Sequence, residues 1–148
     1  MAKKLVINAD DFGRTRGVSA GIIRAHLEGI VTSTTAMMNM PGVANDLLKA
    51  KADAPNLGLG VHLTFTAGRP LLPTEWVASL IDEHGRFLSQ AAIVAEPTRI
   101  DIEELKSELK SQINTFKNAV GQMPDHLDAH HFVHIIPQLF SAYLELAI

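Results

Sequence analysis

The sequence predicts an α/β fold in which strand–helix–strand units pair into a parallel sheet. Short apolar segments rich in Val, Ile and Thr alternate with longer segments whose apolar residues recur at helical spacing. This alternation is typical of βαβ units. The chain has 148 residues, of which 47% are hydrophobic, and this is enough for one domain with a real core. We therefore expect residues 1–148 to form a single domain.

The beginning of the chain supplies one predicted strand–helix–strand unit. Residues 5–9 open with the apolar run Leu-Val-Ile and are predicted to form a buried strand. Residues 17–28 place apolar side chains on one face of a helix, and Gly29 marks its end. Residues 30–38 are rich in Val and Thr, which favour a second strand.

A second unit follows directly. Pro41 suits the first turn of the next helix, because its missing N–H has no partner there in any case. Residues 57–64 are predicted to form the third strand. Gly58 and Gly60 within it permit another backbone to approach closely.

The next segment, residues 65–100, has a weak pattern, and a long loop inside a compact domain is usually functional or mobile. The clearest helix then begins. Asp101 can cap it, Glu104 completes a capping-box arrangement, and Gly121 ends it. Residues 126–130 are predicted to form the fourth strand.

The last predicted helix opens at Pro137 and is strongly apolar up to Ile148. It has no polar tail, and such a helix needs further protein to pack against. We therefore expect the chain to be cut short and to represent part of a longer fold.

Polar side chains follow the predicted strands at one end. Asp10 and Asp11 come after the first strand, His62 lies near the end of the third, and His130 ends the fourth. Functional groups gather at the carboxyl ends of parallel strands. Adjacent carboxylates repel each other unless a cation is near, and without cysteine the available metal ligands are His and carboxylate. Taken alone, the Asp pair is a polar loop or a helix cap, and a lone His is structural; together they indicate a metal-dependent hydrolase.

His130 and His134 are four residues apart, as in the helices of zinc proteases. Position 131 is His, however, where those helices carry the Glu that acts as base. The spacing is therefore weak support for a protease.

Charge and hydropathy exclude two classes of partner. The net charge of −3 is spread without a basic patch, so we expect no nucleic acid. No run approaches the ~18 apolar residues of a membrane span, so we expect no membrane partner. No export signal is visible, and we expect a cytoplasmic protein.

Four collinear motifs are similar to those of one enzyme family. They are Asn8-Ala9-Asp10-Asp11-Phe12-Gly13, Gly29-Ile30-Val31-Thr32-Ser33-Thr34-Thr35, Val61-His62-Leu63-Thr64 with Gly68-Arg69-Pro70-Leu71, and His126-Leu127-Asp128-Ala129-His130-His131 with Val133-His134. Together these motifs resemble the YdjC-like carbohydrate deacetylases, which include the chitooligosaccharide deacetylases. Ala129 and Phe132 depart from the family pattern, which usually has Ser and a third consecutive His there.

The resemblance implies a barrel-like (β/α) fold, and this chain would hold about its first half, since such barrels take ~250 residues. It implies removal of an N-acetyl group from acetylated amino sugars or their oligosaccharides. It also implies a divalent metal at Asp11, His62 and His130, with Asp10 as the catalytic base. The resemblance favours Mg²⁺, while the ligand types leave Zn²⁺ open.

Two other functions and several roles stay open at this point. A metal-dependent phosphoesterase uses similar ligands, and a truncated sugar-binding remnant would keep them without turnover. His134 or His131 could protonate the departing amine, or that acid lies outside this chain. Arg69 could bind sugar hydroxyls or be solvated, and Trp76 could stack on a sugar ring, although a core position is the simpler expectation.

Half of a barrel would leave unpaired strand edges and apolar helix faces. Such surfaces lead to dimers, swapped elements or aggregates. We therefore expect a homo-oligomer.

Overall fold

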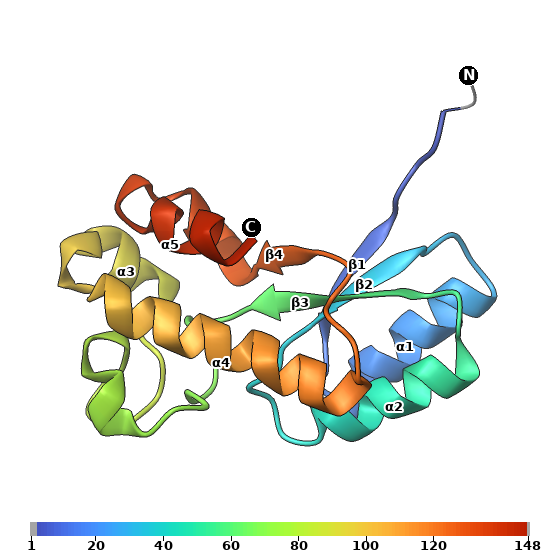
Figure 1. Ribbon diagram of the computed structural model, residues 1–148, viewed down its shortest axis with the longest axis horizontal. Coiled ribbons are helices and arrows are strands. Elements are labelled where there is room, and N and C mark those ends of the chain that lie inside the picture. The colour runs from blue at the N-terminus through green and yellow to red at the C-terminus, as the bar shows by residue number, and fades with distance from the viewer. Residues whose placement is uncertain (1–2, 148) are drawn as a thin grey trace.

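A four-stranded parallel sheet runs through the computed structural model, which describes residues 3–147 (Figure 1). Its strands are β1 (Asn8–Phe12), β2 (Ser33–Ala36), β3 (Gly58–Leu63) and β4 (Leu127–Ala129). Their order in space is their order in sequence, and each neighbouring pair is parallel. This is the arrangement of successive units of a (β/α) barrel. The predicted α/β fold is therefore confirmed.

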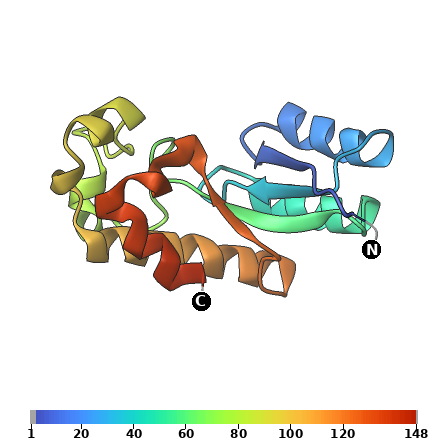
Figure 2. The same cartoon turned by 90° about the horizontal axis from the view of Figure 1, so that it is seen from above.

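Four longer helices pack next to one another beside the sheet. They are α1 (Arg16–Leu27), α2 (Val43–Asp53), α4 (Ile102–Val120) and α5 (Pro137–Ala147). Helix α2 contacts α1 and α4, and α5 lies alongside α4 (Figure 2). Fully buried side chains from sheet and helices form one core, among them Phe12, Leu47, Val61, Leu105 and Phe116. Among residues 3–147, no helix is long and apolar enough to cross a membrane.

The first strand lies further along the chain than the sequence pattern predicts. It begins at Asn8 instead of Leu5, and Leu5 and Val6 are 78% and 72% exposed. Pairing with β2 begins only where Asn8 faces Ser33, so the apolar run precedes the sheet. The predicted buried strand over residues 5–9 is therefore wrong in its position, and both aspartates lie inside the strand.

The segment between β3 and α4 is ordered by two buried polar side chains of α4. The carboxylate of Glu108 accepts hydrogen bonds from the backbone N–H groups of Leu71 (3.1 Å) and Leu72 (3.0 Å). Gln112 exchanges two hydrogen bonds with the backbone of Thr64, at 3.0 and 2.6 Å. Both side chains are fully buried. The segment also forms the short helices η1 (Thr74–Trp76), η2 (Ala78–Leu80), α3 (Gln90–Ala95) and η3 (Pro97–Arg99).

Helix α4 begins and ends close to the predicted residues. Asp101 caps it by accepting from the N–H groups of Glu103 and Glu104, and Gly121 ends it with a φ of 80°. The reciprocal half of the predicted capping box is wrong. Glu104 accepts instead from the N–H of Ser79 (2.8 Å), while the Ser79 hydroxyl accepts from the N–H of Asp101 (2.9 Å). The cap therefore ties the helix to the preceding segment.

Helix α5 follows the turn η4 (His130–Ile135) and buries only one of its apolar faces. Leu139 and Tyr143 are buried, whereas Phe140 and Leu144 are 45% and 47% exposed. The predicted continuation to Ile148 lies outside the described residues. An apolar surface therefore remains beside strand β4, at one edge of the sheet.

Candidate metal centre

A β-bulge brings the two consecutive aspartates to the same site. Successive side chains of a regular strand point to opposite faces of the sheet. In β1 the register shifts between Ala9, which pairs with Thr34, and Phe12, which pairs with Ala36. Asp11 occupies this irregular stretch with a φ of 65°, a left-handed conformation that costs a non-glycine residue ~1–2 kcal/mol. Bulges of this kind re-aim side chains next to functional sites.

Asp11, His62 and His130 converge although they come from three segments of the chain. Asp11 Oδ1 lies 2.9 Å from His130 Nδ1 and 3.3 Å from His62 Nε2. The two imidazole nitrogens are 3.1 Å apart. Both histidines are buried, and the Asp11 side chain keeps partial access to solvent. The structure thus brings together the three residues that the resemblance implies as metal ligands.

The donor atoms fit a divalent cation. One carboxylate oxygen and two imidazole nitrogens lie within 4.8 Å of one another. Within residues 3–147, Asp11 Oδ1 is buried and makes no hydrogen bond, which is costly for a charged oxygen. Oxygen and imidazole ligands suit Mg²⁺, Mn²⁺ or Zn²⁺. Asp11, His62 and His130 therefore form the candidate metal centre.

The electrostatics of the centre favour the protonation states that bind a metal. Burial is the largest cause that lowers the pKa of His130 to about 4; the neighbouring His131 and His62 act in the same direction, and the carboxylate of Asp11 opposes them. Burial alone would raise the pKa of Asp11, but the hydrogen bond from Arg14 (2.8 Å) and the nearby histidines lower it overall. At neutral pH His130 is therefore a neutral imidazole and Asp11 a carboxylate.

Asp128 holds one of the ligands in place; the motif before His130 contains it, but the sequence assigns it no role. Its Oδ1 lies 2.6 Å from His62 Nδ1, while the hydroxyl of Thr35 donates to its Oδ2 (2.9 Å). A hydrogen bond at Nδ1 fixes the tautomer that directs Nε2 towards a metal. Asp10, Asp128 and His62 form a second cluster of ligand-type atoms. In this second cluster, however, His62 Nδ1 is hydrogen-bonded to Asp128. The shared proton explains why these atoms lie close together, so no second metal ion is needed.

Asn8 links Asp10 to Asp128. Its Nδ2 group donates to Asp10 Oδ1 (2.8 Å) and lies 3.3 Å from Asp128 Oδ2. Its Oδ1 accepts from the hydroxyl of Ser33 (2.7 Å) and lies 3.0 Å from His126 Nε2. If the Asn8 amide were turned round, its oxygen would face the carboxylates of Asp10 and Asp128. The two carboxylates therefore determine the orientation of the amide. The side chain of Asp10 is thereby held beside the centre without being one of its three ligands.

The other histidines near the centre have different contacts. His131 Nδ1 lies 3.1 Å from the hydroxyl of Thr66. The ring of His134 packs edge-on against Tyr143, 5.8 Å between centroids. The protease-like spacing of His130 and His134 does not lie on an α-helix, because His131 and Phe132 have φ values of 59° and 56° and break η4.

Two residues considered for sugar binding lie in the segment after β3. The guanidinium of Arg69 donates to the carbonyl of Gly85 (3.2 Å), within the same segment. Trp76 is 63% exposed, so its expected position in the core is wrong. Its short helix η1 lies next to α4, and Trp76 lines a groove together with residues of that helix. Neither residue is part of the cluster of ligand-type atoms.

Known proteins are similar to this chain in sequence and structure. A family model described as YdjC-like protein matches residues 4–148. A carbohydrate deacetylase of Enterococcus faecalis is 46% identical over 134 residues, which are 89% of this chain and 50% of the relative. A chitooligosaccharide deacetylase of Proteus mirabilis is 41% identical, over 99% of this chain and 56% of the relative.

A solved structure extends this similarity to the fold. It is that of an E. faecalis protein described as a candidate cellobiose-phosphate cleavage protein, and it matches with a TM-score of 0.93 at 44% identity. The match covers 99% of this chain and 56% of that chain. The chain thus spans about half the length of the curated relatives it matches.

Proposed function

Because the chain belongs to the YdjC-like family, we propose that it carries the metal centre of a carbohydrate deacetylase. The reaction would be hydrolysis of the N-acetyl group of an amino sugar or its oligosaccharide. The observation that carries the proposal is the convergence of Asp11, His62 and His130 beside the carboxylate of Asp10. Relatives named carbohydrate deacetylase and chitooligosaccharide deacetylase support the substrate class.

Asp11, His62 and His130 would hold the divalent cation, with Mg²⁺ favoured and Zn²⁺ as the alternative. Three protein ligands leave further positions open, as catalytic sites require. When bound, the cation would polarise the acetyl carbonyl and make water easier to deprotonate. The hydrogen bond from Asp128 keeps His62 Nε2 directed at this point.

Asp10 would act as the general base. Its carboxylate accepts the proton of the attacking water as the water oxygen bonds to the acetyl carbon. The carbon–nitrogen bond then breaks, and the amine takes up a proton, so that acetate and the free amino sugar leave. Asn8 donates to Asp10 Oδ1 and thereby fixes the direction of the base. Among the described residues only Oδ1 of Asp10 accepts a side-chain hydrogen bond, which leaves Oδ2 for the water.

Acetate release from N-acetylglucosamine oligomers, with and without EDTA, tests the proposal. We expect release that depends on the metal. Asp10→Asn is the matched variant: turnover should stop while the metal still binds, because the amide can accept a hydrogen bond from Asn8 but cannot take the proton. Loss of metal from this variant would make Asp10 a ligand instead.

Two outcomes would contradict the proposal for this chain. The absence of acetate from folded, metal-loaded protein would leave a sugar-binding remnant as the better description. Hydrolysis of a phosphate ester in place of the amide would favour the phosphoesterase.

A further inference from the structure

The only tryptophan of the chain lies on the surface. Trp76 ends helix η1, and its side chain is 63% exposed. An indole ring in solvent leaves a large apolar area uncovered, and such rings are enriched where a ligand or partner binds. Trp76 lines a groove of about 460 Å³ between the segment after β3 and helix α4.

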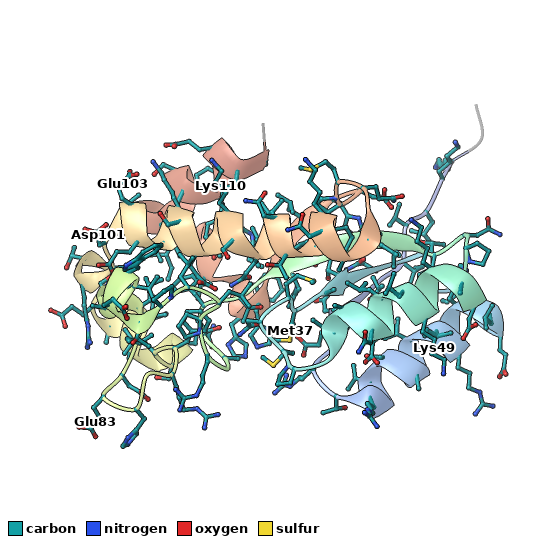
Figure 3. All side chains as sticks on the ribbon, turned by 60° about the horizontal axis from the view of Figure 1, so that its bottom comes forward. Met37, Lys49, Glu83, Asp101, Glu103 and Lys110 are labelled. Carbon is teal, nitrogen blue, oxygen red and sulfur yellow. The ribbon has the colours of Figure 1, made fainter. Side chains whose placement is uncertain are left out.

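The other wall of this groove is a polar face of α4, the helix on which Lys110 is labelled in Figure 3. Four polar residues of this helix recur at helical spacing and share one face, about 16 Å long at 1.5 Å per residue. They are Ser107, Ser111, Asn114 and Asn118. Leu72, Lys110 and Thr115 complete the lining. Within residues 3–147 the hydroxyl and amide groups of these side chains make no hydrogen bond to another protein group, and none of the side chains is buried, so they can bind a ligand.

The position of Trp76 is fixed on α4 from both sides. Before it, the N–H groups of Leu71 and Leu72 donate to Glu108. After it, the N–H of Ser79 donates to Glu104 at 2.8 Å. These bonds fix the backbone on both sides of η1, so less of the chain has to be ordered when a ligand binds. The segment that carries Trp76 is therefore anchored on α4.

The lining favours a saccharide as the ligand. An aromatic face suits the C–H face of a pyranose, and hydroxyl and amide groups both donate to and accept from sugar hydroxyls. Lys110 is the single basic residue in the lining, and one positive charge does not bind the phosphate backbone of a nucleic acid, which requires several. The groove shares no residue with the metal centre.

We propose that Trp76 and the polar face of α4 form a second saccharide-binding site, separate from the metal centre. The choice of an N-acetylated oligosaccharide as its ligand rests on the proposed function. Such a site would retain an oligomeric substrate on the protein between encounters with the centre.

Trp76 provides its own probe, because no other tryptophan contributes to the fluorescence. We expect the N-acetylglucosamine hexamer to change this fluorescence saturably in the presence of EDTA, when turnover is prevented. The double variant Asn114→Ala/Asn118→Ala should weaken the apparent affinity at least about fivefold. Alanine favours the helix, so the fold should persist. The exposed Asn56→Ala is the matched control and should bind as the unaltered protein does.

Three results would overturn the proposal. One is the absence of any fluorescence change or binding heat with the hexamer. Another is binding that survives in the double variant but is lost in His62→Ala, which would place the sugar at the metal centre. The third is a spectral shift with protein concentration alone, which would mean that another copy covers Trp76. Acetate release is measured in a separate experiment. Binding of the hexamer without acetate release would overturn only the proposed deacetylase function. Acetate release without binding at Trp76 would overturn only the proposed saccharide site.

Discussion

At the scale of single residues, the centre depends on side chains that hold the ligands as much as on the ligands themselves. Asp128 bonds His62 Nδ1, Thr35 bonds Asp128, and Asn8 lies between Asp128 and Asp10. All of these contacts except that between Asn8 and Asp10, which lies within β1, join different strands of the sheet. A ligand directed in this way is ready for the metal before it binds.

Asp128→Ala should weaken metal binding by 10- to 100-fold, the usual effect of removing the partner of a ligating histidine. Asp128→Asn should weaken it less, because an amide oxygen can still accept from His62 Nδ1. Calorimetric titration with Mg²⁺ and Zn²⁺ measures the difference. Asp53→Ala, an exposed change at the end of α2, is the control. If all three variants bind the metal with equal affinity, Asp128 does not position His62.

At the scale of elements, strand β4 reaches its place because β3 has a glycine opposite it. A Cβ atom on Gly60 would lie 2.6 Å from the carbonyl oxygen of His126 and 2.9 Å from its ring. The glycines of the third strand were expected to permit a close approach, and at Gly60 the structure confirms it.

Gly60→Ala should therefore push the segment before β4 away and lower the free energy of unfolding by about 1–3 kcal/mol, the usual range for overpacking. Because His126 also contacts Asn8, the metal affinity should fall as well. Urea denaturation and metal titration measure the two effects. Gly21→Ala is the control, since a Cβ there meets nothing within 4 Å. If Gly60→Ala is as stable as that control, the packing argument fails.

Helix α4 organises the long segment after β3 through Glu108. In Glu108→Ala the N–H groups of Leu71 and Leu72 lose their acceptor. The buried amide of Gln112 loses its hydrogen bond to Glu108 as well. An unsatisfied buried donor costs ~1–3 kcal/mol, so we expect a loss of stability of about 2 kcal/mol by urea denaturation. Glu108→Gln keeps one acceptor oxygen and should lose less. If Glu108→Ala leaves the free energy of unfolding unchanged, other contacts hold the segment.

At the scale of the whole molecule, the sheet ends in two strands that each have a free edge within the described residues. Strand β1 pairs only with β2, and β4 only with β3. The exposed side chains of Phe140 and Leu144 lie on α5, beside Leu127 of β4. Unpaired edges next to apolar surface promote association.

We therefore still expect a homo-oligomer, and light scattering after gel filtration measures its mass. Phe140→Lys/Leu144→Lys should shift the mass towards the monomer, because it places charge on exposed apolar positions and leaves the buried Leu139 unchanged. Gln138→Lys, an exposed change on the same helix, is the control. A monomer at the highest attainable concentration of the unaltered chain would contradict the expectation.

Much of the fold could be predicted from the sequence because helices and strands follow from consecutive residues. The long helix matches its cap at Asp101 and its end at Gly121. The apolar run at residues 5–7 predicts a buried strand too early in the chain, because the onset of pairing with β2 decides where β1 begins. A core position is the simpler expectation for Trp76, but its exposure follows from the attachment of the segment around η1 to α4.

The sequence by itself determined the α/β class, the alternation of strands and helices along the chain and the kinds of ligand at the strand ends, since all of these are written in local patterns and residue types. Only the tertiary structure decided how they meet. The bulge that re-aims Asp11 depends on the register with β2, and the bond between His62 and Asp128 joins residues 66 positions apart. Such geometry depends on how distant segments pair, and no pattern within one segment encodes it.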